Sequence, residues 1–432
     1  MIITEPSNPW IAGIGNLFTR EYYQEALSKL TEGGVFGQWM HTYAMAPEDL
    51  RMVYRTFAEV FPEVSLWAVN DSDMILIGTA RPQRLRYADM QATLASRPVA
   101  REDFRDLGFL DAYSLMAMYL MPKASLLKMA GDAAYNLDDF PRLEFLAPRN
   151  LGRDTASLNM ALTRAFAQPP VVEGADPERD PTGRLALALA YGYRVTRERA
   201  LAREWVARSL GKSPMDAQAH LLRARLFADD EQSHAAAEDL LRAVTGPFRL
   251  LDEAVEVAKT LEAEEAVRVL RKIRQQDSRL VEAQVALADA LQQAERYREA
   301  EVEYRELGPV RPRDPRIPFG LGRSLLAQDE YAAALAALDA AAGLGEISGE
   351  FHARRGEALM RLRRYAEAAE AFRHALRTNV ESATWRLNLG ISLAASGPSG
   401  RPEAEQRFRE VLAMDPSNTR AWEELHNLGG RL

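Results

Sequence analysis

The sequence contains no cysteine among its 432 residues. Disulfides, thiolate metal sites and cysteine nucleophiles are therefore excluded together. Its six histidines show none of the spacings typical of metal ligands, so we expect no metal. No window holds the roughly 20 consecutive apolar residues that a membrane-spanning helix requires. A reducing cytoplasm is the simplest location, with membrane association through a partner as the alternative.

Positive charge is also scarce, because 54 Lys and Arg residues face 62 Asp and Glu residues. The formal net charge of -8 argues against a broad nucleic-acid footprint, which needs a basic surface. Apolar content of 47% and charged content of 27% are ordinary for a globular protein. Because domains usually span roughly 100–200 residues, the length indicates two or three of them.

A period of 34 residues is the strongest internal signal. Small residues recur at this interval, at Ala288, Gly322, Gly356 and Gly390. Tyrosines keep the same interval, at Tyr297, Tyr331 and Tyr365. Two antiparallel helices cross closely only where a small residue leaves room, and an aromatic ring packs over the turn. The pattern resembles the tetratricopeptide repeat (TPR), which implies an all-α superhelix of paired helices.

This register predicts first helices beginning near Val281, Pro315, Gly349 and Ala383. Weaker units are expected from about Pro181 onward, and a capping helix is expected from Thr419. The array should therefore occupy residues 181–432, with about six or seven units.

The resemblance to TPR arrays implies a concave groove that binds a protein or peptide. By register, four residues of the first helices are expected to line it, namely Arg323, Arg354, Arg361 and Asn388. Arg323 and Arg354 would lie on adjacent helices and suit an acidic segment. Two plainer interpretations stay open. The arginines could be solvated partners of Glu350 and Glu357, or the array could only support its neighbour.

Residues 1–80 alternate between strand and helix patterns. Strands are predicted at 1–4, 35–40, 64–69 and 74–79, and helices at 18–30 and from Ala46 to Phe61. The second helix has a buried stripe that includes Phe57. This order is typical of the back half of an open α/β sheet.

Three segments carry a resemblance to a known family, namely Glu5-Pro6-Ser7-Asn8-Pro9-Trp10, Leu17-Phe18-Thr19-Arg20-Glu21-Tyr22-Tyr23 and Gly33-Gly34-Val35-Phe36-Gly37-Gln38. They resemble spermidine synthase, and more closely the bacterial spermidine-synthase-like proteins with TPRs after the synthase domain. The resemblance covers residues 1–80 and continues loosely to 149. It implies a methyltransferase-type Rossmann sheet that binds decarboxylated S-adenosylmethionine or a related nucleoside.

The resemblance also points to two candidate catalytic positions, Glu5 and Asn8. In the family, the loop after this strand carries an Asp that deprotonates the amine and a second Asp three residues later. Glutamate moves the carboxylate by about 1.5 Å, enough to harm an aligned displacement. Asparagine cannot supply the anionic charge at all.

The family's sheet also needs a glycine-rich turn after its first strand and an acid after its second. The sequence starts at what would be the fourth strand, so we expect a truncated, inactive domain without a cofactor of its own. A second copy, a separate front-half or membrane subunit, or residues 81–165 would cover the exposed sheet edge. The alternative function is an aminopropyl- or methyltransferase that uses an S-adenosylmethionine-type nucleoside once a front half is supplied.

Residues 81–167 are expected to form a helical extension that packs on the sheet. Helices are predicted at 111–121 and 155–167, and a strand at 142–146. Asp138, Asp139 and Glu144 could be taken for a metal cluster, but we interpret them as turn residues. The segment 168–180, rich in proline and acids, is the predicted linker.

Overall fold

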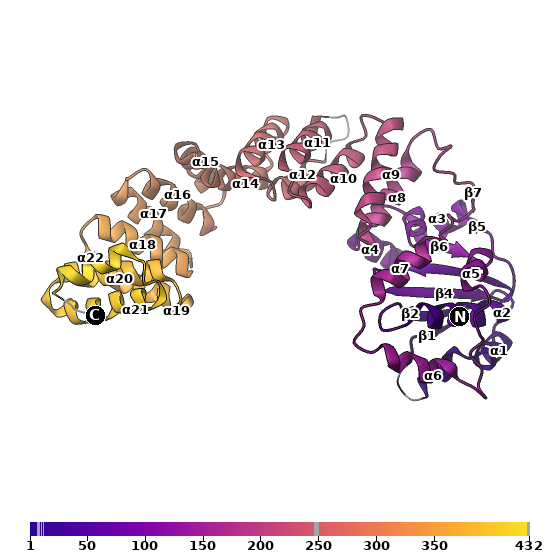
Figure 1. The fold of residues 1–432 in the computed structure, drawn as a ribbon. Coiled ribbons are helices and arrows are strands. Elements are labelled where there is room, and N and C mark those ends of the chain that lie inside the picture. The colour runs from indigo at the N-terminus through magenta and orange to yellow at the C-terminus, as the bar shows by residue number, and fades with distance from the viewer. Residues whose placement is uncertain (7–8, 10, 12, 246–249, 430–432) are drawn as a thin grey trace. The chain divides into compact units, whose positions relative to one another are not determined.

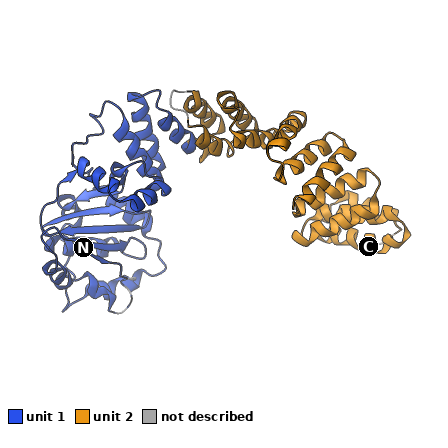
Figure 2. Cartoon of the chain, turned by 180° about the vertical axis from the view of Figure 1, so that it is seen from behind, with its two compact units in different colours: residues 1–226 blue, residues 227–432 orange. Residues whose placement is uncertain are grey.

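The computed structural model describes residues 1–432 with the exception of 7–8, 10, 12, 246–249 and 430–432. The chain divides into two compact units, residues 1–226 and residues 227–432 (Figure 2). The division falls within helix α10 (Ala217–Ala228). A sheet lies in the first unit, and the second unit is helical (Figure 1).

The first unit is built on a five-stranded mixed sheet with the order β1-β2-β4-β3-β6. The strands are β1 (Ile2–Thr4), β2 (Val35–His41), β3 (Glu63–Ala68), β4 (Asp73–Thr79) and β6 (Tyr119–Pro122). β1 pairs with β2 in parallel, and the remaining pairs in this sheet are antiparallel. The four strands predicted within residues 1–80 are confirmed.

One face of this sheet carries the core of the first unit. Four helices pack against this face and complete the core, namely α1 (Arg20–Ser28), α2 (Pro47–Val60), α5 (Lys123–Ala130) and α7 (Ala156–Arg164). Pro47 at the first turn of α2 loses no helical hydrogen bond, and Asp49 accepts the Ala46 amide at 3.2 Å. The two predicted helices of residues 1–80 are therefore confirmed, each ending slightly earlier than expected.

The opposite face of the sheet is also apolar but is incompletely covered. Strand register aligns Ile3 with Gly37 and Gly37 with Ile77, while Trp67 aligns with Ile75. Trp67 packs into a second cluster with residues of the 3-10 helix η2 (Ala112–Ala117) and of α8 (Arg184–Val195). Ile3, in contrast, is 68% exposed. Apolar side chains on both faces are typical of a sheet that is covered by other elements on each face.

Two predictions for the middle region are wrong. Residues 111–121 are not one helix, because η2 ends at Ala117 and β6 then joins the edge of the sheet beside β3. The predicted strand at 142–146 is the helix α6 (Arg142–Leu146), whose buried Leu143 lies four residues before the buried Ala147. β6 lies at the edge opposite β1, so residues 81–165 leave β1 with one strand partner in the described chain.

Short elements connect the sheet to the helical array. α3 (Tyr87–Ala95) and α4 (Pro98–Asp106) follow the hairpin, and the predicted helix at 155–167 is observed as α7. β5 (Leu85–Arg86) pairs in parallel with β7 (Val172–Glu173), so a strand lies within the predicted linker. After it come α8, α9 (Arg199–Lys212) and α10.

The second unit consists of consecutive antiparallel helices. They are α11 (Ser233–Thr245), α12 (Leu251–Ala258), α13 (Ala263–Gln276), α14 (Val281–Gln293), α15 (Tyr297–Val310), α16 (Arg316–Ala327), α17 (Tyr331–Gly343), α18 (Gly349–Arg361), α19 (Tyr365–Thr378), α20 (Ala383–Ser396), α21 (Arg401–Met414) and α22 (Thr419–Asn427). The predicted starts of four first helices and of the capping helix are confirmed to within a residue. Gly397–Gly400, where the repeat pattern is interrupted, contains the 3-10 turn η4 (Pro398–Gly400).

The small residues of the period lie at the helix crossings. A Cβ atom added to Gly356 would lie 2.9 Å from the ring of Phe372, and one added to Gly390 would lie 2.6 Å from Phe408. In these two hairpins an aromatic ring packs closely against a glycine, whereas Gly322 packs against Leu338. Among the described residues, no helix combines the length and the apolar character that crossing a membrane requires.

Candidate partner-binding groove

The first helices of three successive hairpins, α16, α18 and α20, are in contact with their neighbours in the second unit. Because the repeat length is 34, Arg323 on α16 corresponds to Glu357 on α18, and Arg354 on α18 corresponds to Asn388 on α20. The same face of each helix therefore presents a different side chain at an equivalent position.

Two adjoining cavities lie along this face. The smaller has a volume of about 200 Å³ and is lined by Gln292, Tyr297, Arg323, Leu326, Ala327, Arg354 and Glu357. The larger has a volume of about 510 Å³ and is lined by Glu350, Ala353, Arg354, Glu357, Phe372, Ser382, Thr384, Trp385 and Asn388. Arg354 and Glu357 line both cavities, so one extended ligand could occupy the two together.

The local sequence holds the aromatic and amide groups of this groove in place. The hydroxyl of Ser382 accepts the backbone N–H of Trp385 at 3.3 Å and so caps α20. Gln292 donates from Nε2 to the Gly320 carbonyl and to Ser324 Oγ, both at 2.9 Å. These contacts fix the wall of the smaller cavity between α14 and α16.

The charged groups of the groove are partly paired with one another. Glu350 Oε1 lies 3.5 Å from Arg323 Nε on α16 and 3.7 Å from Arg354 Nε on its own helix. Arg354 Nη1 also donates to Glu357 Oε2 at 3.3 Å. Exposed ion pairs of this kind stabilise a structure by at most about 1 kcal/mol each, so they hold these side chains in place only weakly.

Three of the four residues predicted for the groove are brought together, since Arg323, Arg354 and Asn388 all line these cavities. Arg361 lies at neither cavity. Its guanidinium packs 4.8 Å from the ring centroid of Tyr331 and forms an ion pair with Asp329 at 3.2 Å. That position is beside the turn of the preceding hairpin.

Sequence analysis missed other lining residues, notably Gln292, Tyr297, Thr384 and Trp385. A signal for two of them was present, because Gln292 precedes Leu326 by one repeat and Glu350 precedes Thr384 by one repeat. Comparing equivalent positions on each first helix, rather than charged residues alone, would have found them.

The candidate catalytic pair of the first unit does not form a site in the described chain. Glu5 follows β1 and is exposed, and Asn8 lies outside the described residues. His41, at the end of β2, is buried, and its Nδ1 lies 2.9 Å from the Tyr43 carbonyl oxygen. Burial lowers the pKa of His41. Within the described ranges, no three His, Asp or Glu side chains are grouped as metal ligands would be.

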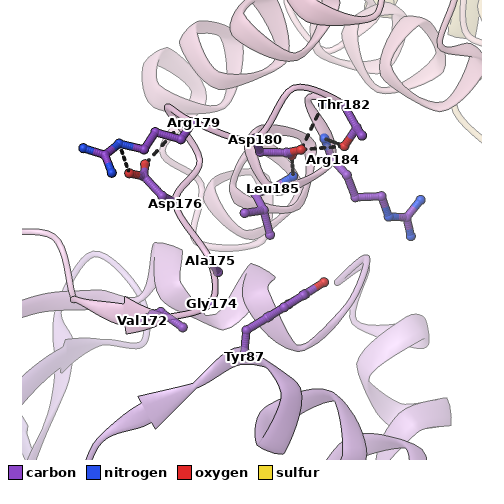
Figure 3. A pocket seen from close by; sticks show the side chains of 10 residues that line it. All are labelled: Tyr87, Val172, Gly174, Ala175, Asp176, Arg179, Asp180, Thr182, Arg184 and Leu185. Atoms are coloured by element: carbon purple, nitrogen blue, oxygen red, sulfur yellow. Dashed lines mark hydrogen bonds and ion pairs between the residues drawn. The ribbon is translucent and has the colours of Figure 1, made fainter.

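A further cavity of about 600 Å³ lies in the first unit, between Tyr87 of α3 and the segment that precedes α8 (Figure 3). Its carboxylates are already engaged by their own loop. Asp180 accepts the Leu185 amide at 2.8 Å and the Thr182 hydroxyl at 2.7 Å. Asp176 accepts the Glu178 amide at 2.9 Å and pairs with Arg179. These groups stabilise the turn into α8, and we assign this cavity a structural role.

Comparison with known proteins supports the repeat. The family model described as "Tetratricopeptide repeat" matches residues 285–348 and 353–397. Comparison with curated proteins gives no match.

Several solved structures are similar in part. MamA from Desulfovibrio magneticus RS-1 is 19% identical, with 39% of this chain and 95% of that chain covered and a TM-score of 0.35. YrrB, a TPR protein with an unusual peptide-binding site, is 17% identical, with coverage of 50% and 96% and a TM-score of 0.35. PilF from Pseudomonas aeruginosa is 18% identical, with coverage of 58% and 99% and a TM-score of 0.37. Together with the observed hairpins, the family match shows that the C-terminal part of this chain contains a tetratricopeptide repeat region.

Proposed function

We propose that this chain is a protein-binding scaffold whose TPR groove holds a peptide segment of a partner between α16, α18 and α20. The observation that supports this is the pair of adjoining cavities, whose lining includes an indole ring, two side-chain amides and two arginines. Aromatic and arginine side chains are enriched at binding hot spots, and side-chain amides can bond a peptide backbone.

Peptide display on the purified chain tests this proposal. We expect selected peptides to lose affinity about tenfold or more when Thr384 is replaced by tyrosine, because the new ring fills the larger cavity. Thr384 is exposed, so the substitution should leave the fold intact. The matched control is Val302→Tyr on α15, where the residue is 54% exposed and lines neither cavity. Peptides that bind both variants equally would place the binding site elsewhere.

We also propose that residues 1–80 are the back part of a spermidine-synthase-like domain, 81–167 its extension, 168–180 a linker and 181–432 the repeat array. The sequence resemblance and the observed order strand, helix, strand, helix, hairpin support the first assignment. A location in the cytoplasm, or at a membrane through a partner, is part of the same proposal. A second copy or a separate front-half subunit would then cover the β1 edge and Ile3.

The alternative function is nucleoside-dependent aminopropyl or methyl transfer, and a titration separates it from the scaffold. We expect no saturable heat when the chain is titrated with decarboxylated S-adenosylmethionine, S-adenosylmethionine or methylthioadenosine. The physical reason is that Glu5 is exposed beside an edge strand and Asn8 carries no charge. Saturable binding of any of the three would favour the transferase and contradict the assignment as an inactive domain.

A further inference from the structure

Arg323 and Arg354 come from different helices but face the same carboxylate oxygen of Glu350. Both guanidinium groups also line the smaller cavity of the groove. Neither contact with Glu350 has the geometry of a strong charge-assisted hydrogen bond, which would be about 2.7–2.9 Å long. Glu350 therefore balances the charge of the two arginines without filling their donors.

Among the described residues, Arg354 has one donor atom, Nε, that lacks a hydrogen-bond acceptor. Its Nε is shielded from water and makes no hydrogen bond within the described structure. Glu350 Oε1 lies 3.7 Å from this Nε, which is too far for a hydrogen bond. A shielded donor without an acceptor is unfavourable, so this position favours an additional acceptor.

We propose that the smaller cavity accepts an acidic side chain of the partner peptide, which displaces Glu350 from Arg323 and Arg354. The inference rests on the groove function proposed above and names the class of partner, a peptide with an aspartate or glutamate at this place. Glu350 is then an internal competitor that occupies the arginines when no partner is bound.

The exchange is electrostatically balanced. One carboxylate replaces another, so the number of charges beside the arginines does not change. The incoming group can approach from the cavity and accept from both guanidinium forks, which Glu350 does not do from the first turn of α18. Glu350, whose side chain is 46% exposed, can turn to solvent at little cost.

The cavity next to it determines how the rest of the peptide continues. Because Arg354 lines both cavities, residues flanking the acid would reach the larger cavity with Trp385 and Asn388. A volume of about 200 Å³ suits a single side chain, whereas whole drug-sized ligands occupy roughly 300–1,000 Å³.

Fluorescence anisotropy with two labelled dodecapeptides tests the proposal on the full chain. One peptide alternates glutamate with alanine, and the other alternates glutamine with alanine. We expect the chain to prefer the glutamate peptide and to lose this preference as salt is raised. Glu350→Gln should tighten binding of the glutamate peptide about threefold to fivefold, because it removes the internal competitor. Arg323→Gln should weaken it about tenfold.

The control is Arg364→Gln, which removes an equally charged residue that lines neither cavity and pairs with Glu367. It should leave the affinity unchanged. Equal affinity for the two peptides, no binding of either, or weaker binding by Glu350→Gln would overturn the acid site. The Thr384→Tyr experiment tests peptide binding by the groove separately. A failure of the acid site can therefore be distinguished from a failure of the groove proposal.

Discussion

Replacing Phe57 with alanine is expected to lower the free energy of unfolding of the first unit by about 3–5 kcal/mol. Phe57 is completely buried beneath the sheet. Its ring centroid lies 4.6 Å from that of Phe61 and 4.9 Å from that of Tyr23. Alanine would leave a cavity that these large, closely packed rings cannot collapse to fill.

Because the chain has two units, one unfolding midpoint would not isolate this effect. Hydrogen exchange followed by mass spectrometry should show faster exchange in β2, β3 and β4 and little change in α14 to α21. The control is Phe145→Ala, since Phe145 is 62% exposed and should change stability by less than about 0.5 kcal/mol. Equal protection of the strands in both variants would show that the aromatic cluster does not stabilise the sheet.

Much of the fold follows from local patterns in the sequence. Apolar runs predict the strands at 35–40, 64–69 and 74–79, and a tight turn separates the last two. The repeat predicts first helices that begin near Val281, Pro315, Gly349 and Ala383, because these positions follow one another at intervals of 34 residues. In each case neighbouring residues or a repeated pattern carry the information, so no distant contact had to be known.

The errors fall where a short apolar segment fits both a helix and a strand. The run around Leu120 is apolar all round and fits a helix or a buried strand, and pairing with β3 selects the strand. Leu143 and Ala147, four residues apart, are both buried, which is the spacing of one helix face. The backbone N–H of Leu143 also donates to Asn136 Oδ1 at 3.1 Å, and together these contacts favour the helix α6. Neither partner is adjacent in the sequence.

The conformation of the hairpin turns could not be predicted from the residue types that form them. Glu295, Asp329 and Arg363 adopt φ values of 58°, 63° and 60°, a left-handed conformation usually given to glycine. Their spacing of 34 residues marks the same turn in three successive hairpins. The strain is accepted because the packed helices on both sides determine the turn.

For the two cavities, the repeat register places three of the four predicted residues at the lining but misplaces the fourth. Arg323, Arg354 and Asn388 line the cavities. Arg361 is instead the last residue of α18, and its Nε donates to the hydroxyl of Tyr331. Selecting residues by charge favoured arginines, although Trp385 and Gln292 shape the cavities as much. Equivalent repeat positions are therefore a better guide to this surface than residue type.

Replacing Gly356 with valine is expected to destabilise the repeat array by about 1–3 kcal/mol, with the loss centred on the α18 and α19 hairpin. The added Cβ would lie 2.9 Å from two ring atoms of Phe372, which is 1% exposed and has no free space to retreat into. The hairpin must open or the ring must leave its rotamer, and both weaken the contacts with α20.

The matched control is Gly343→Ala at the end of α17, because no atom lies within 4 Å of the position its Cβ would take. Alanine there should leave stability unchanged or raise it by up to about 1 kcal/mol, since it favours the helix. Urea unfolding with hydrogen exchange of α18 and α19 would measure both variants. If Gly356→Val unfolded at the same urea concentration as Gly343→Ala, the close crossing would not be what the 34-residue period preserves. A loss restricted to α18, α19 and α20 would instead show that each glycine stabilises its own hairpin and the interface with the next.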